Sequence, residues 1–546
     1  MADYIPTAEQ QAAIEHEGNM VITACPGSGK TTVVVEKIRR KLPELRPYHG
    51  VIGITFTVKA SEELKFRCKK DAFDAKQSFF GTIDSFCLKE IILPFVSRLW
   101  GQADLVLNPV FFKDLAPPEK EALADFGKKG VETSRYDEVE PMLIRLYESG
   151  RILTSSTSLI ACHIIENSLA CRRYLTAKYD TIFIDEYQDS SEPQHQLFKK
   201  LVSIGMTGVA VGDEDQSIYG FRGGSKDFIE ELQANGEFRS FQILTNHRCH
   251  PSISNYARRL YNPTCELQPA EDSRIFRGTY SGNQVDLARK ISEWMPRVRE
   301  RFSVSYNSDV AVLVRGNASL DWVSQGLSVP HRVVKDSPLT DIGGQHARLC
   351  IDLLKFRFDG CITVESILTG NLRLKMPRRE TSSLRHAIRR VKTCLPELLI
   401  DALAEACDAI LSEQIPVTII QALTQIEGSN DQLELFKPVN TNEIQVMTLH
   451  KSKGLEFDVV FHLDLYEWTF PFRLFQSDYN ALPVYPTWDQ ELNLHYVGIT
   501  RAKKACFLLT SGSRLNSDGQ VKNGEPSKFL GLSALSGLYS NLNTGS

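Results

Sequence analysis

The sequence lacks long hydrophobic runs and paired cysteines, and these absences exclude several classes of protein. No apolar run approaches the roughly 20 residues that a membrane-spanning helix needs, and residues 1–18 hold no basic region followed by an apolar one. The twelve cysteines form no C-x-x-C pair and no zinc-finger pattern with histidine. We therefore expect a cytoplasmic protein with reduced thiols, without a disulfide framework or a structural metal.

A strong charge of one sign is also missing. The net charge is -4 and the isoelectric point is near 6.3, so the chain has no global basic signature of a nucleic-acid binder. Any contact with nucleic acid must therefore lie in a local channel. With 546 residues, of which 42% are hydrophobic, the chain is expected to form roughly two to four globular domains.

Buried strands followed by polar turns recur along the chain. The run MVITAC enters a Gly-rich turn and a segment of helical spacing, and GVIGITFT is followed in the same way by VKASEELKFRCKK. Further strand-like runs are YDTIFIDE, GMTGVAVGDED, DVAVLVRG and DVVFHLDL. This alternation predicts parallel sheets in two α/β domains.

Two long helical stretches interrupt this alternation, at about residues 91–177 and 345–439. The second contains LRLKMPRRETSSLRHAIRRVKTCL, which carries eight Lys or Arg against one acid. Two interpretations of residues 372–392 remain open: a solvated helix face, or a surface for DNA or a partner. After Thr510 the chain becomes rich in Ser, Gly and Asn, so we expect an irregular tail.

The most specific motif is ACPGSGKT, formed by Ala24, Cys25, Pro26, Gly27, Ser28, Gly29, Lys30 and Thr31. In a P-loop, glycines let backbone N–H groups close around phosphate at a helix N-terminus, Lys30 reaches the outer phosphates and Thr31 offers a hydroxyl to Mg²⁺. The alternative is a chance Gly-rich turn. The strand before it and the helix after it favour an ATP site.

Paired carboxylates end a second strand, in IFIDE. Asp185 is expected to hold Mg²⁺, and Glu186 to accept a proton from the water that attacks the γ-phosphate. Two such acids could instead cap a helix. Two arginines, Arg248 and Arg501, are candidates for stabilising charge on the γ-phosphate, and Gln216 is a candidate for sensing it. Each of these three residues alone could equally be an ordinary polar residue.

The motifs together resemble the UvrD, Rep and PcrA group of superfamily 1A DNA helicases. The resemblance runs through TAEQQAAI, the P-loop, ITFTVKASEEL, FFGTIDSF, IFIDEYQDSSEPQ, VGDEDQSIYGFRGG, LTNHR, VLVRGN, VMTLHKSKGLEFDVVF and HYVGITRAKKACFLL. It implies two RecA-like P-loop domains with helical insertions. The implied boundaries are 1–92 and 178–270 for domain 1A, 93–177 for insertion 1B, 271–344 and 440–515 for domain 2A, 345–439 for a reduced 2B insertion, and 516–546 for a C-terminal tail.

The resemblance also implies roles for particular residues. Gln10 would read the adenine edge and Glu456 the ribose, while Gln216 would couple the γ-phosphate to DNA. Arg248 and Arg501 would face the nucleotide from opposite sides of a cleft that closes around it. The implied contacts with single-stranded DNA are Phe56, Lys59, Thr82, Tyr219, Phe221, Arg222, Thr448 and His450. Aromatic residues suit such a surface because every base offers a face for stacking. Phe56 alone could equally be a core residue.

Several residues depart from the family pattern. Thr32 stands where an Arg usually follows the P-loop, and His247 where an aromatic residue usually precedes Arg248, so adenine stacking should be weakened. Asp84 replaces a common His in the GTIDSF segment. The second insertion is also shorter than the family's 2B domain. In this compactness the chain resembles the helicase-like subunits of Gabija antiphage systems, which implies an OLD-family nuclease partner in a hetero-oligomer.

Three functions are consistent with these motifs. The first is an ATP-dependent translocase or helicase on single-stranded DNA, with 3′ to 5′ polarity implied only by the resemblance. The second is an ATPase that senses DNA ends or gaps and activates a partner nuclease without processive unwinding. An RNA motor is the third, since nothing in these residues excludes a 2′-hydroxyl. No cluster of acids with a lysine suggests an intrinsic nuclease.

Overall fold

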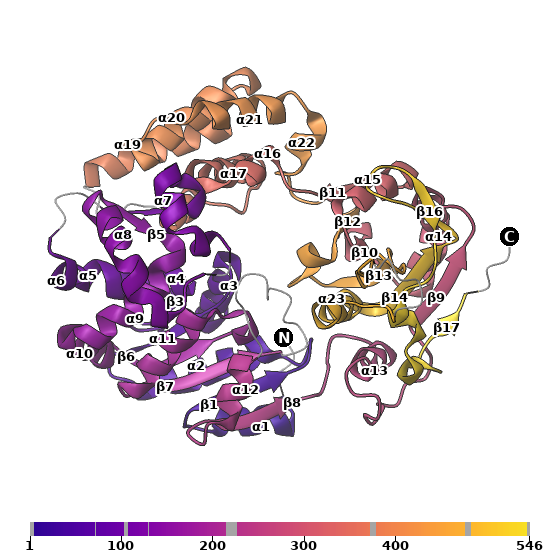
Figure 1. Ribbon diagram of the computed structural model, residues 1–546, viewed down its shortest axis with the longest axis horizontal. Coiled ribbons are helices and arrows are strands. Elements are labelled where there is room, and N and C mark those ends of the chain that lie inside the picture. The colour runs from indigo at the N-terminus through magenta and orange to yellow at the C-terminus, as the bar shows by residue number, and fades with distance from the viewer. Residues whose placement is uncertain are drawn as a thin grey trace.

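The computed structural model of the protein describes residues 5–70, 73–102, 107–128, 130–213, 227–371, 378–475 and 482–542. The chain forms two halves, each built around a parallel β-sheet (Figure 1). We call residues 5–243 the first half and residues 251–542 the second half. The predicted α/β class with parallel sheets is confirmed.

The first sheet has six strands, and all its pairings are parallel. Across the sheet, the order is β3 (Phe79–Gly81), β2 (Gly50–Ile54), β6 (Tyr179–Ile184), β7 (Thr207–Gly212), β1 (Met20–Ala24) and β8 (Arg239–Ile243). The helices of this half that accompany the sheet are α1 (Ala8–Glu15), α2 (Lys30–Glu44), α3 (Val58–Lys69), α11 (Glu192–Ser203) and α12 (Asp227–Ala234). Because the strands are parallel, the polar residues after β1, β6 and β7 meet at one edge.

The second sheet has seven strands, again all parallel. Its order is β11 (His331–Val334), β12 (Ile444–Thr448), β10 (Val310–Val314), β13 (Phe457–His462), β14 (Ala502–Ser511), β9 (Ile275–Tyr280) and β17 (Ser540–Asn541). Its main helices are α13 (Pro251–Arg259), α14 (Gln284–Arg301), α15 (Asn317–Gly326) and α23 (Trp488–Thr500). Helix α13 buries Ile253 and Tyr256 in a hydrophobic cluster of this half.

Each half carries a largely helical insertion. The first insertion, between β3 and β6, contains α4 (Ile83–Phe86), a π-helix (Cys87–Ile92), α5 (Leu93–Phe95), α6 (Ser97–Trp100), β4 (Asn108–Val110), α7 (Pro117–Ala122), α8 (Tyr136–Glu148), β5 (Arg151–Leu153), α9 (Thr157–Asn167) and α10 (Leu169–Lys178). The second, between β11 and β12, contains α16 (Pro338–Ile342), α17 (Gly344–Phe358), α18 (Val364–Asn371), α19 (Arg378–Thr393), α20 (Leu399–Leu411), α21 (Val417–Glu427) and α22 (Asn430–Glu434). The first insertion shares one hydrophobic cluster with the first sheet, whereas the second has a cluster of its own.

The two insertions touch across the top of the molecule (Figure 1). The ammonium of Lys113 donates to the carbonyl of Asp341 at 2.8 Å, and the backbone N–H of Gln345 donates to Asp114 at 3.3 Å. Gly343 and Gly344 have positive φ angles, and a Cβ on Gly344 would lie 2.2 Å from the Asp114 carboxylate. The approach of α17 to the first insertion therefore requires glycine at position 344.

The tail departs from the irregular segment expected from its composition. After Thr510 the chain continues through β15 (Ser513–Leu515) and β16 (Val521–Asn523), and β17 pairs with β9 at the edge of the second sheet. Phe529 and Leu535 are fully buried. Their burial holds the tail in place, which a composition rich in small polar residues did not predict.

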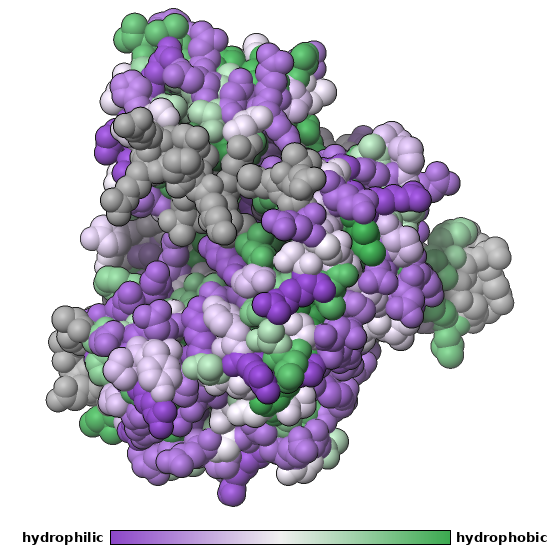
Figure 2. Space-filling view, turned by 90° about the vertical axis from the view of Figure 1, so that its left-hand side faces the viewer, coloured by the Kyte–Doolittle hydropathy of each residue, from purple (hydrophilic) through white to green (hydrophobic). Residues whose placement is uncertain are grey.

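The surface is mostly hydrophilic on the face shown in Figure 2, with hydrophobic residues in small scattered patches. Among the described residues, no helix is both long and apolar enough to cross a membrane.

Candidate nucleotide and nucleic-acid site

The P-loop lies between β1 and α2. Gly27 and Gly29 adopt φ angles of +72° and +81°, and Gly29 is the N-cap of α2 in the left-handed conformation. A Cβ on Gly27 would lie 2.3 Å from the Cβ of Arg248. Glycine is required here because the loop packs directly against the TNHR segment of residues 245–248.

The loop offers groups that suit a bound phosphate. Ser28 is fully buried, and its hydroxyl has no hydrogen-bond partner within the described part of the chain. Lys30 Nζ donates to the carbonyl of Ala24 at 3.1 Å and lies 3.4 Å from Asp213 Oδ2. An unsatisfied buried hydroxyl, a lysine and a helix N-terminus together fit the phosphates of a nucleotide.

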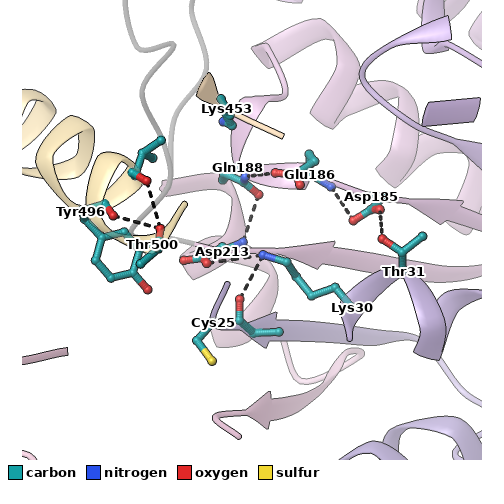
Figure 3. Close-up of polar contacts among 12 residues, drawn as sticks. Cys25, Lys30, Thr31, Asp185, Glu186, Gln188, Asp213, Lys453, Tyr496 and Thr500 are labelled. Carbon is teal, nitrogen blue, oxygen red and sulfur yellow. Dashed lines mark hydrogen bonds and ion pairs between the residues drawn. The ribbon is translucent and has the colours of Figure 1, made fainter. Parts of the chain in front are cut away.

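A chain of hydrogen bonds links the P-loop to the ends of β6 and β7 (Figure 3). The Thr31 hydroxyl donates to Asp185 Oδ2 at 3.2 Å, and the amide of Gln188 donates to Glu186 Oε2 at 2.6 Å. The Gln188 carbonyl oxygen in turn accepts from the backbone N–H of Asp213 at 3.0 Å. Glu186 has a φ angle of +58°, a strained conformation that is found at functional sites.

The two carboxylates differ in acidity. Burial and the negative charge of Glu186 raise the pKa of Asp185 to about 6. Burial alone would raise the pKa of Glu186 too, but the charges of Lys30 and Lys453 outweigh it and the pKa is lowered. Glu186 therefore stays ionised at neutral pH, as a proton acceptor must.

Thr31 and Asp185 are suited to Mg²⁺. The two side chains present oxygen atoms beside the phosphate loop. Mg²⁺ prefers oxygen ligands and is often held by only one or two protein groups, with substrate phosphates and water completing its shell. The residues present therefore fit this ion.

Both candidate arginines lie where the two halves meet. Arg248 Nη2 is 3.1 Å from Glu456 Oε1 of the second half. Arg501 is 2% exposed and donates to the carbonyls of Val497 and Leu455 at 3.0 and 3.2 Å. Burial and the nearby Arg248 lower the pKa of Arg501 to about 10, so it keeps its charge at neutral pH.

Sequence reasoning missed a second ion pair between the halves. Lys453 Nζ lies 2.7 Å from Asp189 Oδ2, and their side chains are 10% and 1% exposed. Burial raises the pKa of Asp189 to about 6, and the charge of Lys453 opposes that rise. Both residues lie in motifs that the sequence shows, since Asp189 follows the carboxylate pair and Lys453 lies in KSKGLEF. No sequence pattern, however, indicates that these two motifs are in contact.

The side of the site where the adenine base is expected contains Gln10 and a residue that sequence reasoning missed. Gln10 is 1% exposed, and its amide donates to the carbonyl of Ser28 at 2.8 Å. Arg67 of α3 donates to the Thr32 hydroxyl at 2.8 Å, which places a guanidinium beside the position where the family carries its own arginine. His247 lies near the loop, with its backbone N–H donating to the carbonyl of Gly27 at 2.9 Å.

The expected DNA contacts are only partly described. Phe56 is 42% exposed at the end of β2, so it is not a core residue. Thr82 caps α4, Thr448 ends β12 and His450 lines a cavity. Gln216, Tyr219, Phe221 and Arg222 lie outside the described residues, as does the side chain of Lys59.

Asp84 of α4 makes a contact within the first insertion. Its carboxylate accepts a hydrogen bond from the Thr157 hydroxyl at 2.9 Å. Burial raises its pKa, and the Thr157 hydrogen bond and the charge of Arg348 oppose that rise. Where the family commonly has His, this chain therefore uses a carboxylate for an internal contact.

Comparison with known proteins identifies the family. Residues 6–95 and 132–237 match the UvrD/REP helicase N-terminal domain, and residues 374–513 match the UvrD-like helicase C-terminal domain. Gabija protein GajB of Bacillus cereus (strain VD045) is 26% identical over 92% of this chain and 95% of its own length. ATP-dependent DNA helicase PcrA of Staphylococcus aureus (strain Mu50 / ATCC 700699) is 23% identical over 97% of this chain and 86% of its own length.

A probable DNA helicase II homolog of Mycoplasma pneumoniae (strain ATCC 29342 / M129 / Subtype 1) is 22% identical over 96% of this chain. It is covered over 85% of its own length. The two matched domains together span more than half of the chain, and they contain the P-loop, the paired carboxylates and Arg501. The chain therefore belongs to the UvrD-like family of DNA helicases and is an ATP-hydrolysing enzyme.

Proposed function

We propose that the protein is a Mg²⁺- and ATP-dependent motor that moves along single-stranded DNA in the 3′ to 5′ direction. The observation that carries this proposal is that residues of both halves meet at the P-loop. Asp189 of the first half pairs with Lys453 of the second, and Arg248, in the segment that joins the halves and packs against the P-loop, pairs with Glu456 of the second half. A nucleotide bound there would contact both halves, so hydrolysis and release would change how they fit together.

The roles of the site residues follow from their positions. Lys30 and the P-loop bind the phosphates, Thr31 and Asp185 hold Mg²⁺, and Glu186 takes a proton from the attacking water. Arg248 and Arg501 stabilise the charge that develops on the γ-phosphate, and Mg²⁺ supplies further neutralisation when bound. Gln10 contacts the base, with Arg67 beside it. In this scheme the two sheets are domains 1A and 2A, and the two insertions are 1B and a reduced 2B.

In this proposal the DNA strand passes Phe56, Thr82, Thr448 and His450, of which Thr448 is buried. Stacking on exposed aromatic side chains tolerates any base, which suits a motor that must step through every sequence. Phe56 is exposed beside α3, in agreement with such a role. The expected contributions of Lys59, Tyr219, Phe221 and Arg222 belong to the same track.

A second function is favoured by the resemblance to GajB and by the contact between the insertions. In this alternative, the protein senses DNA ends or gaps, hydrolyses ATP and activates an OLD-family nuclease in an antiphage complex. In this alternative, the hydrogen bond from Lys113 to the main-chain carbonyl of Asp341 would break when DNA or the partner separates the two insertions.

ATP hydrolysis on single strands of increasing length separates the two functions. A translocase hydrolyses more ATP per binding event on a longer strand, so its rate rises with length until dissociation limits it. A sensor is stimulated by DNA to an extent independent of length. Absence of any stimulation, with an intact protein, would contradict both.

A further inference from the structure

A chain of polar contacts runs from the paired carboxylates to the surface of the first half. Tyr187 directly follows Glu186 and is fully buried, and its hydroxyl lies 2.8 Å from Nδ1 of His195 on α11. His195 is also fully buried. Its Nε2 lies 3.1 Å from Oε2 of Glu231 on α12, at an angle that is not ideal for a hydrogen bond. The chain of contacts ends at Lys199, whose ammonium lies 2.6 Å from Glu231 Oε1.

The neighbours of His195 define the state of its imidazole. Burial lowers the pKa of His195, and the charge of Glu231 opposes this shift without reversing it, so the ring is neutral at neutral pH. A neutral imidazole has one N–H and one acceptor nitrogen. A proton on Nε2 faces the Glu231 carboxylate and leaves Nδ1 free to accept, whereas the other tautomer would turn a lone pair toward that carboxylate. His195 therefore accepts a hydrogen bond from the Tyr187 hydroxyl.

Aromatic packing holds both rings in this arrangement. The His195 ring stacks on Phe228 of α12, with centroids 4.6 Å apart and an angle of 14° between the planes. The Tyr187 ring meets Phe198 of α11 edge-on, with centroids 5.2 Å apart. Helix α12 also packs against residues 187–189. Two helices therefore fix the residue that follows Glu186.

Glu186 is in a conformation that needs such support. Its φ angle of +58° is uncommon for a residue with a side chain, and such strain persists only where the surroundings enforce it. Its backbone N–H donates to Asp185 Oδ1 at 3.0 Å, and its carboxylate accepts from the Gln188 amide at 2.6 Å. Both contacts are made within residues 185–188. The Tyr187 hydroxyl adds a contact from this segment to α11.

We propose that His195 is a positioning residue for ATP hydrolysis, which holds the Tyr187 hydroxyl and so keeps the Glu186 carboxylate in place for the attacking water. The inference rests on the proposed function, since it assumes that Glu186 is the proton acceptor. It makes His195 part of the functional machinery although it lies outside the nucleotide site. A histidine that only fills the core would contribute to stability but not to kcat.

The test is steady-state ATP hydrolysis by the full-length protein, with and without single-stranded DNA. His195→Phe keeps a ring that can stack on Phe228 but cannot accept from Tyr187. It should lower kcat about 10- to 10²-fold, since a displacement of about 1 Å can cost this much, and leave KM for ATP nearly unchanged. Tyr187→Phe should lower kcat to a similar extent. The double variant should lose no more than either single variant, because all three lack the same contact.

Two further variants separate positioning from stability. Leu201→Ala is the matched control, since Leu201 lies on α11 and is as fully buried as His195 but has no polar group. It should lower the melting temperature and leave the kcat of the folded protein unchanged. His195→Asn should recover part of the kcat lost in His195→Phe, because its amide oxygen can take the place of Nδ1 as acceptor.

Wild-type kcat in both His195→Phe and Tyr187→Phe would overturn the inference, and so would an equal loss of kcat in Leu201→Ala. Tyr187→Phe removes only one oxygen atom and provides the same measurement if His195→Phe does not fold. Wild-type kcat in Glu186→Gln would instead show that the proposed role of Glu186 fails. If the wild-type protein hydrolyses no ATP under either condition, the proposed function itself fails.

Discussion

Lys453 and Asp189 form a buried ion pair between the two halves, with Nζ and Oδ2 separated by 2.7 Å. Asp189 lies four residues after Asp185, and Lys453 lies between the expected DNA contact His450 and the expected ribose contact Glu456. The pair therefore joins the carboxylate motif of the first half to the segment of the second half that is expected to touch both DNA and nucleotide.

Lys453→Ala should reduce DNA-stimulated ATP hydrolysis at least tenfold and lower the melting temperature. Removing one partner of a buried ion pair typically costs about 3–5 kcal/mol, because the other charge remains without compensation. A double-mutant cycle with Asp189→Asn measures the coupling, and the double variant should lose less than the sum of the two single variants. Additive losses would show that the pair carries no coupling.

Lys451→Ala provides the control for that prediction. Lys451 pairs with Asp336 at 3.0 Å, but the two side chains are 24% and 43% exposed. Surface pairs of this kind contribute about 0–1 kcal/mol. The control should therefore leave stability and hydrolysis nearly unchanged.

Glu186→Gln should lower kcat about 10²- to 10⁴-fold, the usual contribution of a general base. Hydrolysis at saturating ATP and single-stranded DNA measures this loss, and binding of a non-hydrolysable ATP analogue should be retained because Lys30 and the P-loop are unchanged. Burial alone would raise the pKa of Glu186, but the charges of Lys30 and Lys453 lower it, so the wild-type side chain is an ionised acceptor at neutral pH. Wild-type kcat in Glu186→Gln would exclude Glu186 as the proton acceptor.

Arg501→Ala and Arg248→Ala should each reduce kcat, by up to the 10³- to 10⁵-fold reported for arginine fingers. Arg501→Lys should recover little, because one ammonium cannot replace a guanidinium that donates to the carbonyls of Val497 and Leu455 at once. Single-turnover hydrolysis and binding of a non-hydrolysable ATP analogue separate catalysis from affinity. Arg289→Ala, on an exposed surface pair, is the control. A wild-type kcat in Arg501→Ala or Arg248→Ala would show that the substituted arginine does not contribute to catalysis.

Two buried histidines predict a pH dependence of stability. His462 and His495 are fully buried, with His495 Nδ1 3.0 Å from His462 Nε2. The His462 Nδ1 contacts the carbonyl of Leu463 at 3.1 Å, so it carries its proton and Nε2 accepts from His495. Burial lowers the pKa of His462 to about 4 and that of His495 well below its usual value.

Stability should therefore fall as the pH drops from about 6.5 to 4, because the two histidines bind protons in the unfolded state but stay neutral in the folded state. For His462 alone, the shift corresponds to roughly 3 kcal/mol. Melting temperatures of wild type and His462→Leu/His495→Phe across this range test the prediction, and the double variant should show a flatter profile. The exposed His386→Asn should retain the wild-type slope. If the melting temperatures of wild type and the double variant fall equally steeply with pH, other titratable groups cause the pH dependence.

The sequence predicted the two α/β sheets and the positions of the P-loop and Asp185–Glu186 because these signals are local. Strand periodicity, glycine spacing and acids at strand ends need no knowledge of distant residues. Residues 24–31 and 185–186 accordingly meet at the edge expected for parallel strands.

Contacts between distant segments were not predictable. No local pattern in the sequence joins Asp189 to Lys453, which lie in different halves, or Thr32 to Arg67, which lie on α2 and α3 of the first half. The prediction of an irregular tail was wrong for a related reason. Apart from EPSKFL, which contains Phe529, its composition shows little pattern, and the burial of Phe529 and Leu535 depends on a surface supplied by residues far earlier in the chain.

Directional movement on DNA is the central claim, and displacement of streptavidin from biotinylated oligonucleotides tests it most directly. The account predicts ATP-dependent displacement from the 5′ end, slower or no displacement from the 3′ end, and loss of both in Lys30→Ala. Failure to displace streptavidin from either end, by a protein whose ATP hydrolysis is stimulated by the same strand, would contradict translocation and favour a DNA-sensing ATPase.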